Sequence, residues 1–410
     1  MKIKKLFALV TSICLLAVFP VSASAAKTPC KCGETPQVVV KGFLKPLYYN
    51  EGGAIEIPAL LGHVLMDAQG RSILPATRSW HIDPAQDHSA EPEYEFLHDY
   101  RLDTFQAAAH LHDFIETLCA QTGHKKIALS GRSHGASIIL TYLKVYGPAR
   151  LDTFILANGT FHGATLMGEI ILGRFGLSGP ALLNVLDALE PESDILAAAT
   201  GLLRNTPVTR FNMRLAGTSF LLGNTLLPML RRMPSVWAML PEPYFREARP
   251  LLDGYPTLGA LVDKYHDEVQ TQAAKLIKDA KKAGVKVAVF ASYGKAPIPI
   301  TQNTAYQCDF LADTTYESGG ATVAPMGQTL PSVDSTPGKS KYRSPDGIID
   351  AATCILPDQT WFIKYNDHFT LPYALQQWII RSKTQPSITA NPDFPQYLRI
   401  FSDGTTAPLK

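Results

Sequence analysis

The sequence predicts an α/β fold in which a mostly parallel sheet with crossover helices is interrupted by a helical insertion. Short apolar strands alternate with amphipathic helices in both halves of the chain. Between residues 161 and 267 the alternation stops, and the segment is rich in Leu, Met, Gly and Pro. A chain of 410 residues with 46% hydrophobic content can bury a large core of this kind.

Each expected strand is a short run of apolar, often β-branched residues, and each expected helix carries its apolar residues on one face. The strands are expected at residues 38–40, 126–130, 151–157, 285–290 and 361–365. The helices are expected at residues 105–120, 136–146, 266–283 and 373–381. The Pro-rich tail beyond residue 385 is expected to be irregular.

The pattern divides the chain into a core and a cap. The core is expected over residues 26–160 and 268–410, and residues 161–267 form a helical cap inserted between them. The apolar runs of this insertion favour the interpretation that it lines a lipid-binding site. The alternative is an ordinary helical subdomain with its own core. The segment of residues 48–92 is too long to be a simple connecting loop in a compact domain. It is therefore expected to contain short secondary-structure elements or to shape a site.

The N-terminus has the pattern of a secretory signal peptide over residues 1–25. Lys2, Lys4 and Lys5 precede an uncharged apolar stretch, and a small-residue Ala-Ser-Ala site ends at Ala25. The expected location is therefore periplasmic or extracellular, with no integral membrane segment after cleavage. An uncleaved anchor is the alternative, which the short apolar run disfavours.

Charge and composition exclude some partners. Only 18% of residues are charged, the net charge is +2, and no basic run marks a nucleic-acid surface. We expect no cofactor and no metal. A Cys-Lys-Cys sequence lacks the further ligands of a zinc site. A weak metal pattern in the 48–92 segment consists of His81, Asp87 and His88.

Export makes disulfides possible. Cys308 and Cys354 both lie in the irregular C-terminal third and are one candidate pair for a bridge, although the connectivity is not readable from the sequence.

The strongest chemical motif is the pentapeptide Gly-Arg-Ser-His-Gly at residues 131–135. It follows an apolar strand and precedes a helix, which is the context that a nucleophile elbow requires. Glycines permit the tight turn, and the turn exposes the serine at the C-terminal end of the strand. Ser133 is therefore the expected nucleophile of an α/β-hydrolase.

The general base is expected to be His368. In this fold the acid and the histidine follow the serine along the chain, and four histidines follow Ser133. His134 is adjacent to the nucleophile and cannot fold back onto it, whereas His162 and His266 lie near the cap. His368 stands between the last expected strand and the last expected helix, where a base belongs.

Asp346 is the expected acid. It lies in a turn that enters an apolar run and precedes His368 by a short distance in sequence. A carboxylate there would orient the imidazole and stabilise its protonated form. Asp350, Asp309 and Asp313 remain alternatives.

The oxyanion hole is expected to use two backbone N–H groups. One belongs to His134, directly after the nucleophile, and the other to Phe43, in the turn after the first strand, with Leu44 as the alternative.

These motifs resemble, in order, those of the lecithin:cholesterol acyltransferase-like branch of α/β-hydrolase lipases. The similar segments lie at residues 96–103, 154–163, 234–241 and 346–349, and the resemblance spans residues 38–378. It implies a lid-covered lipid ester site and a triad of Ser133, Asp346 and His368. The chain departs from the family at Lys41-Gly42, where the family has His-Gly.

The expected function is hydrolysis of lipid carboxylic esters by a secreted lipase, esterase or phospholipase through an acyl-enzyme. An acyltransferase that passes the acyl group to an alcohol is the first alternative. A non-catalytic lipid-binding protein on the same scaffold is the second.

Overall fold

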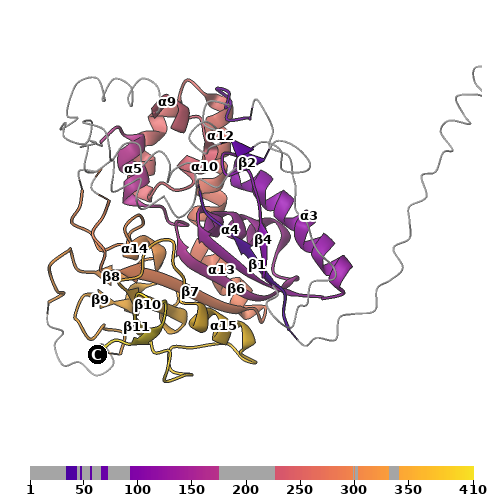
Figure 1. Ribbon diagram of the computed structural model, residues 1–410. Coiled ribbons are helices and arrows are strands. Elements are labelled where there is room, and N and C mark those ends of the chain that lie inside the picture. Colours follow the sequence, from indigo (N-terminus) through magenta and orange to yellow (C-terminus); the bar gives the residue numbers. More distant parts are fainter. Residues whose placement is uncertain are drawn as a thin grey trace, which may run out of the picture.

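The computed structural model describes residues 34–43, 47–48, 56–57, 66–72, 93–174, 227–298, 300, 303–331 and 341–410. In this part of the chain an eight-stranded sheet has the order β12-β11-β10-β7-β6-β5-β1-β4 (Figure 1). All neighbouring strands are parallel except β11 and β12. The strands are β1 Gln37–Val40, β4 Glu93–Phe96, β5 Ile127–Ser133, β6 Leu151–Gly159, β7 Lys286–Tyr293, β10 Thr360–Lys364, β11 Tyr397–Ile400 and β12 Thr406–Pro408.

Helices cover both faces of this sheet, as the alternating pattern predicts. One apolar cluster joins the sheet to α3, α4 and α13, and a second joins its other face to α15. Along β5, Leu129 belongs to the first cluster and Ala128 to the second, so adjacent side chains face opposite layers. The helices are α3 Thr104–Thr122, α4 His134–Tyr146, α13 Ala273–Lys282 and α15 Tyr373–Arg381.

The predicted α/β-hydrolase fold class is confirmed by this sheet, and all five expected strands form. Three strands of this sheet were not expected: β4, β11 and β12. The tail predicted as irregular contributes β11, which pairs with β10, and β12, which pairs with β11. The helix expected at residues 266–283 is divided, because a π-helical turn at His266–Gln270 precedes α13.

The chain between β6 and β7 carries a group of short helices, which lie together beyond the sheet (Figure 1). They surround an apolar cluster of their own that includes Trp237, Leu240 and Phe245. Tyr100 belongs to the same cluster, and Phe43 packs against it. The described helices are α5 Thr165–Ile171, α9 Leu227–Leu230, α10 Pro234–Trp237, α11 Glu242–Ala248, the 3₁₀ turn Arg249–Leu252 and α12 Pro256–Tyr265.

Smaller elements complete the described chain. They are the pair β2 Leu47–Tyr48 and β3 Glu56–Ile57, the pair β8 Thr322–Val323 and β9 Ile349–Asp350, the helix α14 Thr314–Glu317, and the 3₁₀ turns Ala351–Thr353 and Pro357–Gln359. No helix in the described ranges combines the length and apolar character needed to cross a bilayer. The signal segment, Leu44 and the metal pattern at His81, Asp87 and His88 lie outside the described residues. The division at residues 161 and 267 stays a prediction.

Candidate active site

Ser133 occupies a sharp turn between β5 and α4. Its backbone has φ 53° and ψ −129°, a conformation that non-glycine residues rarely adopt. The two glycines of the motif are sterically required. A Cβ on Gly131 would lie 2.7 Å from the carbonyl oxygen of Gly135, and a Cβ on Gly135 would lie 2.0 Å from that of Val40. The strained serine is therefore held by close packing of the elbow against β1.

The turn after β1 passes directly beside the nucleophile. A Cβ on Gly42 would lie 2.6 Å from the Cβ of Ser133 and 2.9 Å from its Oγ. The next residue is Phe43, whose ring meets that of Tyr100 edge to face with centroids 4.7 Å apart. His134 begins α4, where backbone N–H groups lack helical partners. Both expected oxyanion donors thus belong to segments that adjoin Ser133, and their role stays a prediction.

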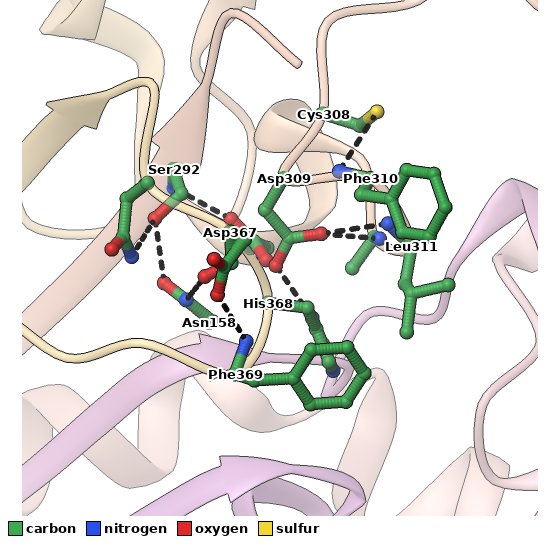
Figure 2. Close-up of polar contacts among 12 residues, drawn as sticks. Asn158, Ser292, Cys308, Asp309, Phe310, Leu311, Asp367, His368 and Phe369 are labelled. Atoms are coloured by element: carbon green, nitrogen blue, oxygen red, sulfur yellow. Dashed lines mark hydrogen bonds and ion pairs between the residues drawn. The ribbon is translucent and has the colours of Figure 1, made fainter. Parts of the chain in front are cut away.

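His368 is paired with Asp309, as Figure 2 shows. The distance from His368 Nδ1 to Asp309 Oδ2 is 2.5 Å. Asp309 is 0% exposed and His368 8%. The second carboxylate oxygen, Oδ1, accepts N–H groups from Leu311 at 2.9 Å and Ala312 at 2.7 Å. Burial pushes the pKa of Asp309 upward, but the adjacent His368 and the hydrogen bonds hold it below its ordinary value. An ionised Asp309 therefore faces the imidazole.

The structure does not bring Asp346 to His368, so that predicted pairing is wrong. Asp346 Oδ2 accepts hydrogen bonds from Lys364 at 2.9 Å and from Tyr293 at 3.0 Å. Burial acts to raise the pKa of Asp346, and hydrogen bonds from Ser344, Lys364 and others outweigh it. Its carboxylate is thus occupied by an ion pair. Asp309, one of the alternatives, takes the position beside the histidine.

The other two alternatives also have structural partners. Asp350 accepts the N–H of Ala352 at 2.9 Å. Asp313 accepts the N–H of Thr165 at 2.7 Å and its hydroxyl at 2.6 Å, and so joins the segment after β7 to helix α5. Neither carboxylate is hydrogen-bonded to His368 among the described residues.

Polar side chains at the strand ends hold the His368 loop in place. Ser292, in β7, donates its hydroxyl to Asn158 Oδ1 at 2.9 Å, and Asn366 Nδ2 donates to Ser292 Oγ at 2.8 Å. Asn158, at the end of β6, donates to the carbonyl of Asp367 at 3.2 Å (Figure 2). The loop that carries His368 therefore lies at the carboxyl edge of the sheet.

Arg132 supplies a further link from the elbow itself. Its Nη2 donates to the carbonyl of Phe369 at 2.9 Å, so the residue before Ser133 bonds the residue after His368. The serine and the histidine are tied to the same edge through their chain neighbours.

The remaining histidines after Ser133 have other environments. His134 is fully buried, both ring nitrogens lack partners among the described residues, and burial together with nearby His98 lowers its pKa to about 3. Burial lowers the pKa of His162 to about 4. His266 hydrogen-bonds Glu242 and Asp267 and stacks on Phe245 in helix α11.

One group in the described chain has metal-ligand atoms close together: Asp309, Glu317 and His368, all within 4.8 Å of one another. Nδ1 of His368 already bonds Asp309. Burial and the neighbouring Asp309 raise the pKa of Glu317 well above its ordinary value, which disfavours the ionised form that a metal ligand needs.

The candidate disulfide between Cys308 and Cys354 is not formed. Both cysteines are free and buried. Cys308 Sγ lies 3.3 Å from the carbonyl of Lys295, beside the Asp309 loop. Cys354 instead packs in an apolar cluster with Ile349. The two thiols thus occupy separate environments.

The sheet order and the placement of these groups define the α/β-hydrolase fold. A strained serine ends β5 before a helix, a buried aspartate follows β7, and a histidine follows β10. This is the serine, acid, histidine order of that class.

No protein-family model and no curated protein matches the sequence. Solved structures similar to the chain include a meta-cleavage product hydrolase from Pseudomonas fluorescens, at 13% identity over 66% of this chain and 77% of that one, with a TM-score of 0.28. Lipase 1 from Pelosinus fermentans is 14% identical over 82% and 92%, with a TM-score of 0.29. A thermophilic esterase from Thermogutta terrifontis is 13% identical over 60% and 90%, with a TM-score of 0.19. The fold assignment rests on the sheet and the elbow.

Proposed function

We propose that this protein is a serine hydrolase that cleaves carboxylic esters with Ser133, His368 and Asp309. The observation that carries the proposal is the 2.5 Å bond between buried Asp309 and His368, at the sheet edge where strained Ser133 ends β5. A nucleophile, a base and a group that orients the base are the parts that serine catalysis needs.

The chemistry follows from those parts. The hydroxyl of Ser133 attacks the ester carbonyl while Nε2 of His368 accepts its proton, and Asp309 stabilises the imidazolium. The backbone N–H groups of Phe43 and His134 would donate to the oxyanion. His368 then returns the proton to the departing alcohol, which leaves an acyl-enzyme. Water, activated by the same histidine, releases the acid.

The substrate that the surroundings favour is an apolar, lipid-type ester. The cluster around Trp237 and Leu240 continues to Phe43, directly after the glycine that touches Ser133. An acyl chain bound from the Ser133 side would meet Phe43, a partly buried side chain at the margin of this cluster. The N-terminal pattern supports export, so a periplasmic or extracellular lipid esterase is the proposed role.

A serine-directed fluorophosphonate tests the nucleophile. Labelling is expected for the wild type and for Ser387→Ala, a serine far along the tail, and absent for Ser133→Ala. Hydrolysis of a series of p-nitrophenyl esters would then rank acyl-chain lengths. Equal labelling of Ser133→Ala would overturn the proposal.

The product decides between hydrolysis and acyl transfer. Incubation with phosphatidylcholine and a sterol is expected to yield free fatty acid. Sterol ester as the main product would assign the protein to the acyltransferases, and absence of both products together with absence of labelling would favour a binding protein.

A further inference from the structure

Glu317 is a second carboxyl group beside the proposed acid. It ends the short helix α14 and is 0% exposed. One oxygen, Oε2, accepts the backbone N–H of Ser292 at 2.7 Å. The other, Oε1, is buried and makes no hydrogen bond to the described residues. A carboxyl oxygen of Glu317 lies within 4.8 Å of both a carboxyl oxygen of Asp309 and a ring nitrogen of His368.

Two ionised carboxylates at this separation in a buried site would repel each other strongly. Asp309 has the partners of an anion: the imidazole and two backbone N–H groups. Glu317 has a single N–H donor and an unsatisfied oxygen, which is the environment of a neutral acid. A proton on Oε1 would remove the repulsion and supply the missing hydrogen-bond partner.

We propose that Glu317 is a neutral carboxylic acid whose O–H donates to the carboxylate of Asp309 and thereby positions Asp309 for His368. Glu317 is then a positioning residue, because it acts on the reaction only through Asp309. This inference rests on the proposed triad and deepens it.

A neutral Glu317 would favour the ionised form of Asp309. Burial alone would raise the pKa of Asp309 and weaken it as a partner for the imidazolium. A neutral donor stabilises the anionic form without adding a second negative charge that would compete for the proton of His368. Burial, reinforced by the negative charge of Asp309, raises the pKa of Glu317 well above the ordinary glutamate value, which agrees with the neutral form.

The same group also connects the acid to the loop network. Ser292 donates its backbone N–H to Glu317 and its hydroxyl to Asn158. Asn158 in turn donates to the carbonyl of Asp367, next to His368. Through Ser292, Glu317 links the acid side and the histidine side of the site.

The matched pair Glu317→Gln and Glu317→Leu tests the proposal. Glutamine keeps the shape, accepts from Ser292 and still offers an N–H donor to Asp309. Its kcat/KM for a p-nitrophenyl ester is expected within about threefold of the wild type, since one neutral donor replaces another. Leucine fills similar space without a donor, and its kcat is expected to fall about 10- to 100-fold with little change in KM.

The pH profile separates this role from simple structural support. Loss of the donor raises the pKa of Asp309, so the acid limb of the Glu317→Leu profile should move to higher pH. The Glu317→Gln profile should superpose on that of the wild type between about pH 5 and about pH 9. Loss of activity in Glu317→Gln as large as that in Glu317→Leu would overturn the proposal, because it would mean that the ionised carboxylate is needed.

Infrared spectroscopy supplies a readout that does not depend on activity. At neutral pH the wild-type spectrum minus that of Glu317→Gln should contain the C=O stretch of a protonated carboxylic acid. A difference spectrum with carboxylate bands instead would overturn the proposal even if Glu317→Leu does not fold. Failure of the proposed function shows separately, as absence of phosphonate labelling in the wild type.

Discussion

Replacing Asp309 with Asn tests the pairing on which the proposed mechanism depends. The carboxylate of Asp309 accepts two backbone N–H groups on Oδ1 and the His368 Nδ1–H on Oδ2. An amide has one acceptor oxygen and one NH₂ group. Its oxygen should face the N–H groups of Leu311 and Ala312, which places the NH₂ toward His368.

That orientation of the amide forces His368 into the tautomer that cannot act as a base toward Ser133. Nδ1 of His368 must then accept a hydrogen bond, so the ring proton moves to Nε2, the nitrogen that should take the proton of Ser133. The imidazolium also loses its negative partner. We expect kcat/KM for a p-nitrophenyl ester to fall by about 10³- to 10⁴-fold, the size of effect typical of this change in a serine triad. Phosphonate labelling should slow in parallel.

Asp346→Asn is the matched control. It breaks the ion pair with Lys364 and the hydrogen bond from Tyr293, both outside the His368 contact. It should cost about 1–3 kcal/mol of unfolding free energy, because hydrogen bonds to a charged group are lost, and leave kcat/KM within about threefold. If Asp346→Asn were the more damaging of the two, or Asp309→Asn were fully active, the assignment of the acid would be refuted.

Three further outcomes follow from the described contacts. Gly135→Ala should destabilise the protein by about 3 kcal/mol or prevent folding, because its Cβ would lie 2.0 Å from the carbonyl of Val40; urea unfolding checks this, and unchanged stability contradicts it. Burial raises the pKa of Asp313 from 3.8 to about 6, so the protonated form is favoured on folding, and its contribution to stability is full below about pH 4 and is lost as pH rises through about 6. Asp313→Asn should therefore remove a fall in unfolding free energy of about 3 kcal/mol across that window; identical pH slopes for both proteins would count against it. Because Cys308 and Cys354 are free and buried, maleimide should modify both only after unfolding; a peptide bridged between these two cysteines in non-reducing mass spectrometry would show otherwise.

Local sequence was sufficient for the central strands and the elbow. The tight turn at Ser133 excludes side chains at Gly131 and Gly135, so the motif must appear in the sequence itself. The apolar runs of β5 and β6 are buried on both faces and leave a continuous signal. The position of His368 between a strand and a helix was likewise visible, although its role as base stays a prediction.

Two strands at one end of the sheet, β11 and β12, were missed for the opposite reason. In β11 a polar Arg399 interrupts the apolar run, and β12 has only three residues. Both strands are stabilised by their pairing in the sheet, and a one-dimensional pattern does not record pairing.

The choice of Asp309 as the proposed acid depended wholly on tertiary structure. Asp309 lies 59 residues from His368, in an irregular segment after β7, and no local feature distinguishes it from Asp313 or Asp346. Its burial, its two backbone donors and neighbouring Glu317 exist only when that segment folds against the sheet edge. By itself the sequence determined the fold class, the elbow and the candidate histidine, because steric and periodic constraints act between near neighbours. The tertiary structure decided which carboxylate meets the imidazole, because charge, burial and hydrogen bonding act between residues that are distant along the chain.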